Sequence, residues 1–345
     1  MNQQWRLART PVEGWPTNGD FEWVESDMPD PGSGQVLTLT LFVSMDPYQW
    51  SRRRSGTEQP GDVCHGRSVS RVIAGKTERF TEGDIIFNTN GWQAYGLTGE
   101  GITTHGYMFP RKLDPGVAPV STALGVLGML GLTAYSGLIV QCEPRAGETV
   151  VVSAASGGVG QVAVQLARTR GARVVGVAGS EEKCRFVVEE LGAAACVSHR
   201  DPEYAGVLAA ACPDGIDVYF ENVGGAVYEG VLALLNRNAR ITVCGYISQY
   251  GNEDGRNPRE VWDAMGAATF ERQNVAVHDL FVGNFVEAHQ ERFVEEMGAR
   301  FQAGEIVYRE HVYDGLESAP RAFGDMLAGR NFGKTLVRCS DEARE

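Results

Sequence analysis

A glycine-rich turn between a strand-like run and a helical pattern carries the clearest chemical signal in this chain. Residues 150–161 read Val-Val-Val-Ser-Ala-Ala-Ser-Gly-Gly-Val-Gly-Gln, and residues 159–170 carry apolar side chains at helical spacing. A second apolar run follows at residues 173–178. In this context glycines bind a dinucleotide, because the backbone can approach a pyrophosphate and the helix N-terminus offers N–H donors. The residues expected to hold the pyrophosphate are Gly157, Gly158, Val159 and Gly160.

The end of the second strand bears on which dinucleotide binds. Sites that prefer NAD usually place Asp or Glu there, to accept the ribose 2′-hydroxyl. Here the strand ends in Gly179 and Ser180, and Lys183 lies one helical turn further on. Ser180 can donate a hydrogen bond to a 2′-phosphate and Lys183 can offer it a charge, while Arg200 follows the next predicted strand as a second cation. This pattern favours NADP over NAD.

Length and composition bound the class of protein. The chain has 345 residues, enough for two domains of ordinary size, with 43% hydrophobic and 22% charged residues. Its net charge of -13 disfavours nucleic acid and anionic membranes as partners. The first residues, Met-Asn-Gln-Gln-Trp-Arg-Leu, do not have the pattern of a secretory signal, and no apolar run has the length of a membrane span. We therefore expect a cytoplasmic protein.

The cysteines indicate neither a disulfide framework nor a zinc lobe. The seven cysteines are scattered, and no two form a Cys-x-x-Cys pair. Cys64 and His65 are neighbours, but adjacent side chains of a strand point to opposite faces and rarely share one metal. The segment Ser44-Met45-Asp46 adds no thiolate. No metal site is therefore predicted.

The order of the predicted elements indicates an α/β protein. Residues 1 to about 120 contain short β-like runs such as 35–43, 68–73 and 83–87, typical of an antiparallel barrel-like domain. After a helical region at 124–142, helices and strands alternate, which predicts a parallel, doubly wound sheet. The alternating elements beyond the glycine turn are helix 181–191, strand 195–198, helix 202–211, strand 215–222, helix 226–235 and strand 240–245. The tail predicts helix 285–303, strand 307–312, helix 315–328 and a final strand, 333–338, that returns to the first domain.

Motifs from end to end resemble the medium-chain dehydrogenase/reductase superfamily, within its zinc-free, NADPH-dependent alkenal/one reductase branch. That branch includes leukotriene B4 dehydrogenases/prostaglandin reductases, plant double-bond reductases and bacterial curcumin reductases. Besides the glycine turn, the matching segments are Ser44–Tyr48, Gly131–Tyr135, Ala178–Lys183, Glu221–Gly225, Cys244–Tyr250 and Asn331–Lys334. The resemblance implies a GroES-like β-barrel catalytic domain (1–123 and 314–345), completed by the C-terminal tail. It likewise implies an NADPH-binding Rossmann domain (124–313) and a homodimer joined through that domain.

The resemblance also implies roles for single residues. Tyr250 matches the tyrosine that donates a hydrogen bond to the substrate carbonyl, and it follows a sheet strand at the end where α/β sheets bind ligands. Tyr48 matches a position beside nicotinamide and substrate, where we expect it to orient the substrate; its Asp-Pro-Tyr context would equally suit a simple turn. The remaining residues expected to contact the cofactor are Met129, Thr133, Gly179, His199, Asn222, Tyr250 itself, Phe281, Val282, Gly283 and Asn331.

The expected reaction is reduction of the C=C bond of α,β-unsaturated ketones or aldehydes. Without a metal, alcohol oxidation lacks its electrophile, whereas addition of a hydride to the β-carbon of an enone needs only orientation and stabilisation of an enolate oxygen. A phenol hydroxyl, with an ordinary pKa of about 10, suits that role. The alternatives are a quinone oxidoreductase of the same superfamily, a dehydrogenase running the family reaction in reverse, and a non-catalytic NADPH-binding protein.

Two segments depart from the family pattern. Where the family continues Asp-Pro-Tyr with Met-Arg-Gly-Arg, this chain has residues 49–54, Gln-Trp-Ser-Arg-Arg-Arg. These arginines either steer an anionic substrate or form a solvated loop, so substrate specificity does not carry over. After the third strand of the cofactor domain, His199 and Arg200 replace the family's Tyr-Lys, and His199 takes the position that contacts the adenosine phosphate.

Overall fold

The structure of the protein, a computed structural model, describes residues 1–105 and 107–344 and divides into two compact units. The first comprises Met1–Met129, Gln290–Gln302 and Glu310–Glu345, and the second Leu130–His289 and Ala303–Arg309. The boundaries expected from the sequence put residues 290–302 in the cofactor domain, whereas the compact units put them in the first unit. The division into catalytic and cofactor domains stays a prediction.

The first unit is built on a mixed seven-stranded sheet. Its spatial order is β14-β15-β3-β4-β5-β7, and β6 pairs with another part of β3. The strands are β3 (Gln35–Ser44), β4 (Ser68–Gly75), β5 (Ile85–Asn88), β6 (Tyr95–Gly99), β7 (Arg111–Lys112), β14 (Glu310–Asp314) and β15 (Lys334–Arg338). A separate hairpin joins β1 (Asn2–Leu7) to β2 (Phe21–Ser26). One part of the core consists of Val36, Val72, Phe80 and Ile86.

The C-terminal tail completes this unit, as predicted. Strand β15 pairs antiparallel with β3, Leu336 facing Ser44, and β14 pairs parallel with β15. Helix α9 (Ala319–Leu327) begins after a 3-10 turn, packs on β15 and buries Phe323. Because β3 is ten residues long, its first half can pair with β6 while its second half pairs with β15. This pairing brings residue 334 next to residues 45 and 46.

The second unit is a six-stranded parallel sheet in the order β10-β9-β8-β11-β12-β13. The strands are β8 (Thr149–Val152), β9 (Arg173–Ala178), β10 (Ala195–Ser198), β11 (Ile216–Glu221), β12 (Leu235–Val243) and β13 (Ala276–Asp279). The apolar runs of the central strands β8, β9 and β11 are buried on both faces, which is typical of a parallel sheet covered by helices. The predicted α/β class with a doubly wound sheet is confirmed.

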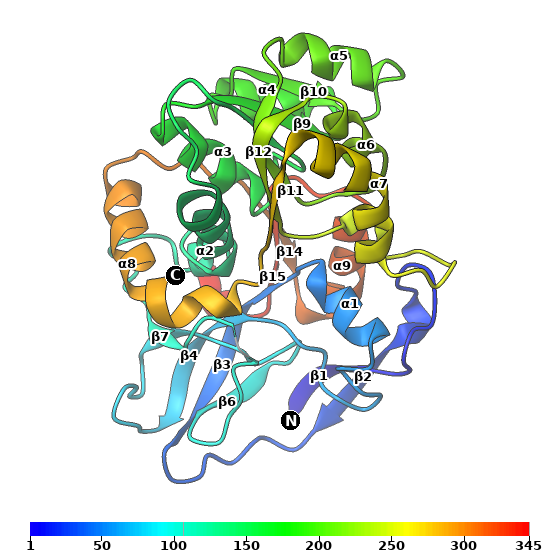
Figure 1. Ribbon diagram of the computed structural model, residues 1–345. Helices are drawn as coiled ribbons and strands as arrows, with labels where there is room; N and C mark the ends of the chain where they lie inside the picture. The colour runs from blue at the N-terminus through cyan, green and yellow to red at the C-terminus, as the bar shows by residue number, and fades with distance from the viewer. Residues whose placement is uncertain (106, 345) are drawn as a thin grey trace. The chain divides into compact units, whose positions relative to one another are not determined.

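Helices cover both faces of this sheet (Figure 1). Side chains from α5 (Tyr204–Ala211), α6 (Gly225–Leu232) and α7 (Pro258–Gln273) form one core with sheet residues such as Tyr219 and Ile241. Their strand neighbours point to the other face, where Gly137 lies against Phe220 and Thr242. The remaining helices of the chain are α1 (Tyr48–Arg54), α2 (Met129–Tyr135), α3 (Gly160–Thr169), α4 (Glu181–Glu189) and α8 (Gly283–Gln302).

One predicted helix was wrong, and two elements were missed. The region 124–142 is not one helix: a 3-10 segment (Val120–Leu124) is followed by α2 and then by a π-helix (Ser136–Cys142). The break falls between Gly125 and Gly128, and a Cβ at Gly128 would collide with the Ala123 carbonyl. Helix α7 and strand β13 were not recognised from the sequence. Within the described residues, no helix is both long and apolar enough to cross a membrane.

Candidate functional site

The glycine turn folds tightly between β8 and α3. A Cβ at Gly160 would lie 2.2 Å from the Ala154 carbonyl oxygen, and one at Gly157 would lie 3.1 Å from the same atom. Ala154 has a φ of 48°, in the left-handed region that non-glycine residues rarely adopt. At the N-terminus of α3, Val159 provides no side-chain cap. The turn is therefore narrow, and no side chain caps the N-terminus of the helix that follows, which fits the binding of a pyrophosphate there.

Basic side chains gather at the C-terminal end of β9. The Ser180 hydroxyl caps α4 by accepting the Lys183 N–H at 3.3 Å. The imidazole of His199 lies 3.2 Å from the position that a Cβ would take at Gly179, and the Arg200 guanidinium lies 4.0 Å from it. Burial and the neighbouring Arg200 cation lower the pKa of Lys183, and the same two causes lower that of His199. Like charges held this close fit an anionic group such as a 2′-phosphate.

A buried carboxylate organises the loop after β11. Glu221 accepts the backbone N–H groups of Val223 and Gly224 at 2.7 and 3.0 Å and the Tyr219 hydroxyl at 2.8 Å. It also accepts the Ser153 hydroxyl and the indole N–H of Trp262, each at 3.1 Å. Burial raises its pKa, although these donors oppose the rise. This network holds the loop that carries a predicted cofactor residue.

That predicted residue, Asn222, is fixed against the start of the glycine turn. Its side-chain amide donates to the Ser153 carbonyl at 2.7 Å, and its backbone N–H donates to the Ser153 hydroxyl at 2.8 Å. The loop after β12 is joined to the same segment, since Ile247 N–H donates to the Asn222 carbonyl and Ser248 N–H to the Val223 carbonyl. The glycine turn, the Asn222 loop and the loop that leads to Tyr250 therefore form one connected edge of the sheet.

Tyr250 lies at the end of that second loop. It follows a short 3-10 turn (Ile247–Gln249) after β12, and its ring is half-buried. Its hydroxyl oxygen accepts the Tyr246 N–H at 3.2 Å. Burial raises the pKa of Tyr250 well above its usual value, so the phenol stays protonated at neutral pH. A protonated hydroxyl held by its oxygen can donate a hydrogen bond to a ligand.

The other predicted residues of this region differ in exposure. Thr133 on α2 is buried, as is Met129 at the end of the first unit, and the two lie one helical turn apart. After β13, Phe281 is 51% exposed and Val282 is buried, and Gly283 begins α8.

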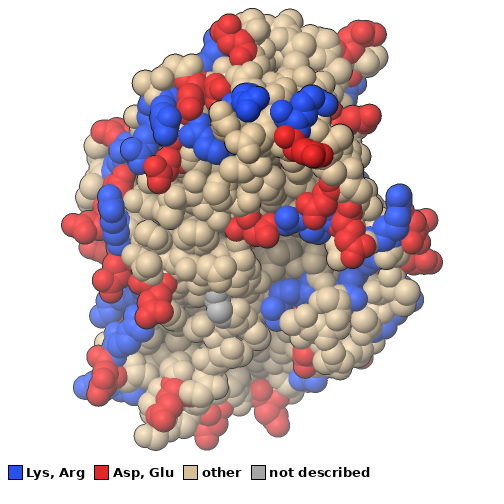
Figure 2. Space-filling model, viewed as in Figure 1, with Lys and Arg blue, Asp and Glu red and all other residues tan. Residues whose placement is uncertain are grey.

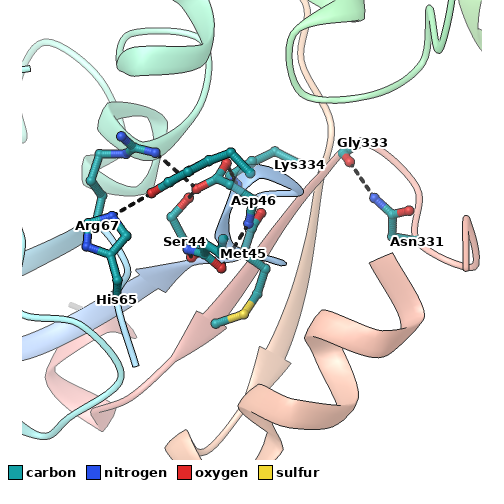
Figure 3. Close-up of polar contacts among 10 residues, drawn as sticks. Ser44, Met45, Asp46, His65, Arg67, Asn331, Gly333 and Lys334 are labelled. Carbon is teal, nitrogen blue, oxygen red and sulfur yellow. Dashed lines mark hydrogen bonds and ion pairs between the residues drawn. The ribbon is translucent and has the colours of Figure 1, made fainter. Parts of the chain in front are cut away.

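The first unit contains a buried ionic cluster that the sequence analysis did not identify (Figure 3). Asp46 accepts from the Lys334 ammonium at 2.8 Å and from the Ser44 hydroxyl at 2.5 Å, and Arg67 lies 3.5 Å from it. Lys334 also donates to the Met45 carbonyl at 2.6 Å. Burial alone would raise the pKa of Asp46, but the cations of Lys334 and Arg67 outweigh it and lower the pKa. The cluster locks the segment that precedes Tyr48.

Tyr48 itself is paired with a histidine. Its hydroxyl lies 2.7 Å from Nε2 of His65, and the Arg67 guanidinium sits over its ring at 4.9 Å. The same guanidinium lies 4.5 Å from the ring centre of Tyr107, which packs on Tyr48. The ring of exposed His105 meets the edge of His65 at 4.8 Å. The sequence analysis marked Tyr48 and considered His65 only as a metal ligand. It did not connect the two, because they come from different segments of the chain.

Asn331 faces its own loop. Its amide donates to the Gly333 carbonyl at 2.9 Å, which shapes the turn before β15 (Figure 3). The neighbouring Lys334 of the same motif reaches the Asp46 cluster instead. The proposed contact of Asn331 with the cofactor stays a prediction.

The donors around Cys64 and His65 do not fit a metal site. His65 points to Tyr48, whereas the Cys64 thiol lies beside buried Glu58 and Arg53, and burial raises its pKa to about 12. A zinc ligand would have to be a thiolate. Within residues 1–105 and 107–344, no three or more His, Cys, Asp or Glu side chains come together as a metal-binding group. The residues present therefore do not fit zinc.

Comparisons with known proteins cover the whole chain. Residues 3–104 match the family described as the N-terminal domain of oxidoreductase, and residues 158–298 match one described as zinc-binding dehydrogenase. The chain is 39% identical to an NADPH-dependent curcumin reductase of Escherichia coli, over 99% of this chain and 98% of that protein. It is 35% identical to an NADP-dependent 2-alkenal reductase of Nicotiana tabacum, over 97% of each. The crystal structure of CurA from Vibrio vulnificus in complex with NADPH is similar with a TM-score of 0.89 and 36% identity, covering 98% of this chain and 99% of CurA.

Proposed function

Because this chain belongs to the zinc-free alkenal/one reductase branch of the medium-chain dehydrogenase/reductase superfamily, we propose that it reduces the C=C bond of α,β-unsaturated ketones and aldehydes with NADPH. When bound, NADPH supplies the hydride that is added to the β-carbon. The observation that carries the proposal is the protonated Tyr250 hydroxyl, held by the Tyr246 N–H at the carboxyl end of a parallel sheet. A donor held there stabilises the negative oxygen that develops as the carbonyl becomes an enolate.

The proposed cofactor contacts lie at the carboxyl ends of neighbouring strands of the parallel sheet. The narrow turn Gly157–Gly160 holds the pyrophosphate, and the group around Gly179 holds the 2′-phosphate through Ser180, Lys183, His199 and Arg200. Asn222, rigid through its two bonds to Ser153, contacts the nicotinamide ribose. The remaining proposed contacts, close to the nicotinamide or reaching the cofactor from the tail, are Met129, Thr133, Phe281, Val282, Gly283 and Asn331.

Tyr48 is proposed to touch the substrate. The Asp46 cluster locks the residue before the Pro47 turn, and α1 then begins at Tyr48. A ring fixed in this way is pre-organised to orient a bound alkene. Tyr48 and Tyr250 thus serve as the two catalytic residues of the proposal.

Partners and location follow from the same assignment. A homodimer through the second unit is supported by β13, which is the edge strand of the sheet and, among the described strands, pairs only with β12.

A cytoplasmic location is supported by seven free cysteines, which suit a reducing compartment. Acidic and basic side chains are interspersed on the face drawn in Figure 2. The proposed partner is a small molecule, an enone or enal. Light scattering of the purified protein tests the dimer.

The test of function is the initial rate of NADPH consumption with an alkenone, a quinone and a saturated ketone, with the products identified. Selective loss of the alkenone C=C bond supports the proposal, and turnover of the quinone alone refutes it. Tyr250→Phe should then lower kcat/KM about 100-fold, the usual effect of removing one donor to an oxyanion. Tyr228→Phe is the matched control, because its buried hydroxyl has no hydrogen-bond partner within the described part of the chain.

A further inference from the structure

The hydrogen bond between Tyr48 and His65 is short and shielded from water, which favours proton transfer along it. The phenol oxygen and Nε2 of His65 are 2.7 Å apart. His65 is 5% exposed and the ring of Tyr48 is half-buried, so little water competes for this bond. Both residues belong to the first unit, where the Asp46–Lys334 ion pair fixes the turn before Tyr48.

The protonation states of the pair suit a donor phenol and a neutral imidazole. Burial raises the pKa of Tyr48 above its usual value, and Arg67 only partly offsets this. Burial, and after it the cations of Arg67 and Arg52, lower the pKa of His65 well below its usual value. At neutral pH the pair is therefore Tyr–OH beside neutral His. A neutral imidazole can accept a proton at one nitrogen while it releases one from the other.

Arg67 is placed to stabilise the state in which Tyr48 has lost its proton. Its guanidinium is 1% exposed, lies 4.9 Å from the ring centre of Tyr48 and keeps Nη1 without a hydrogen-bond partner among the described residues. A cation at this distance favours a phenolate. The guanidinium also lies 4.5 Å from the ring centre of Tyr107, and its Nη2 lies 3.5 Å from Asp46.

His65 also contacts an exposed residue. Exposed His105 packs against its ring at a centroid distance of 4.8 Å. An exposed imidazole therefore lies against the buried one, on the route by which we propose that solvent protons reach His65. Tyr250 belongs to the second unit, where its hydroxyl oxygen accepts the Tyr246 N–H.

We propose that Tyr48 donates the proton that the α-carbon receives and that His65 recharges it from solvent. This inference rests on the proposed enone reduction. After the hydride has reached the β-carbon, the enolate C=C electrons form a bond from the α-carbon to the Tyr48 proton, and the Tyr48 O–H bond breaks. With His65 as its Nε2–H tautomer, the phenolate then takes the Nε2 proton while Nδ1 takes one from water, so the imidazole ends as the Nδ1–H tautomer. Exchange with water, which adds a proton at Nε2 and removes one from Nδ1, restores the starting tautomer. Each cycle thus consumes one solvent proton.

The test uses an alkenone with a methyl group on its α-carbon, so that protonation creates a stereocentre. The wild-type protein should give one enantiomer, as read by chiral gas chromatography. Tyr48→Phe should lower kcat about 100-fold, the lower end of the usual contribution of a general acid, and give a mixture of enantiomers, because water then protonates the enolate from either side. Tyr107→Phe, the same change in the neighbouring ring, should keep the wild-type enantiomer ratio.

A second variant tests recharging separately. His65→Phe keeps the Tyr48 proton for one cycle, so the first turnover should keep its rate and its enantiomer while later turnovers slow by about tenfold or more. NADPH titration and thermal unfolding of each variant check that the chain is folded. If the wild type leaves the C=C bond intact, the proposed function fails. If it reduces the bond but Tyr48→Phe still gives one enantiomer at the wild-type rate, the proton-donor role fails while the function stands. If His65→Phe shows no fast first turnover followed by slower ones, the recharging role fails.

Discussion

Replacing Gly160 by alanine tests whether the narrow glycine turn supports both the fold and the cofactor site. The added Cβ would lie 2.2 Å from the Ala154 carbonyl oxygen and 2.8 Å from Ala155 Cα. Real Cβ atoms essentially never approach closer than 3.0 Å, so the oxygen and the new carbon must separate by about 0.8 Å. Both neighbours are backbone atoms, and Ala154 already has a φ of 48°, so a rotamer change cannot relieve the contact.

The expected cost follows from this geometry. Over-packing in a dense region typically costs ~1–3 kcal/mol, and we expect the upper end because the backbone must move. Gly206→Ala is the matched control. Gly206 is an exposed residue of α5 with nothing within 4 Å of the new Cβ, and alanine there should stabilise the helix by up to ~1 kcal/mol. The two alanines should therefore change stability in opposite directions.

The assay is urea unfolding followed by tryptophan fluorescence, together with NADPH titration. Gly160→Ala should unfold at lower urea and bind NADPH at least about tenfold more weakly, which corresponds to ~1.4 kcal/mol of lost binding energy. Gly206→Ala should bind NADPH as the wild type does. A Gly160→Ala protein that matches the wild type in both stability and NADPH affinity would refute the reasoning on the turn.

Three further predictions concern other parts of the molecule. Arg200→Ala should raise the Kd for NADPH about tenfold and leave that for NADH unchanged, as measured by fluorescence titration; an equal loss for both cofactors would contradict a 2′-phosphate contact. Folding lowers the pKa of His65, so the neutral imidazole stabilises the folded protein fully above the ordinary histidine pKa of 6.5. As the pH falls below 6.5 this stabilisation is lost, by up to ~1.4 kcal/mol per pH unit. Urea unfolding should then show that the free energy of unfolding decreases less between pH 7.5 and pH 5.5 for His65→Gln than for the wild type. An equal decrease for both proteins would count against a neutral buried imidazole. Glu221→Gln should destabilise the chain by ~1–3 kcal/mol, because the new amide faces the Trp262 N–H; Trp262→Phe should recover part of that loss in the double variant, and purely additive effects would argue against this contact.

The sequence by itself determined the elements whose signals are local. The β8–α3–β9 unit was recognised because the glycine turn, the strand before it and the helix after it all lie within thirty residues. The cationic end of β9 was recognised for the same reason, since Ser180 and Lys183 belong to one helix start. Helix α7 escaped recognition because it has little apolar periodicity: only Trp262 and Gly266 are buried along its 16 residues.

Only the tertiary structure decided which distant side chains meet. Lys334 and Asp46 are 288 positions apart, and they form an ion pair because β15 returns to pair with β3. His65 reads from the sequence as a possible metal ligand, and its hydrogen bond to Tyr48 becomes visible only once the segments are packed. A buried charge or imidazole must find its partner within about 3 Å, and the chain path that supplies this partner is set by strand pairing rather than by neighbouring residues. Local pattern therefore determined the proposed cofactor edge of the sheet, while long-range pairing decided the surroundings of Tyr48.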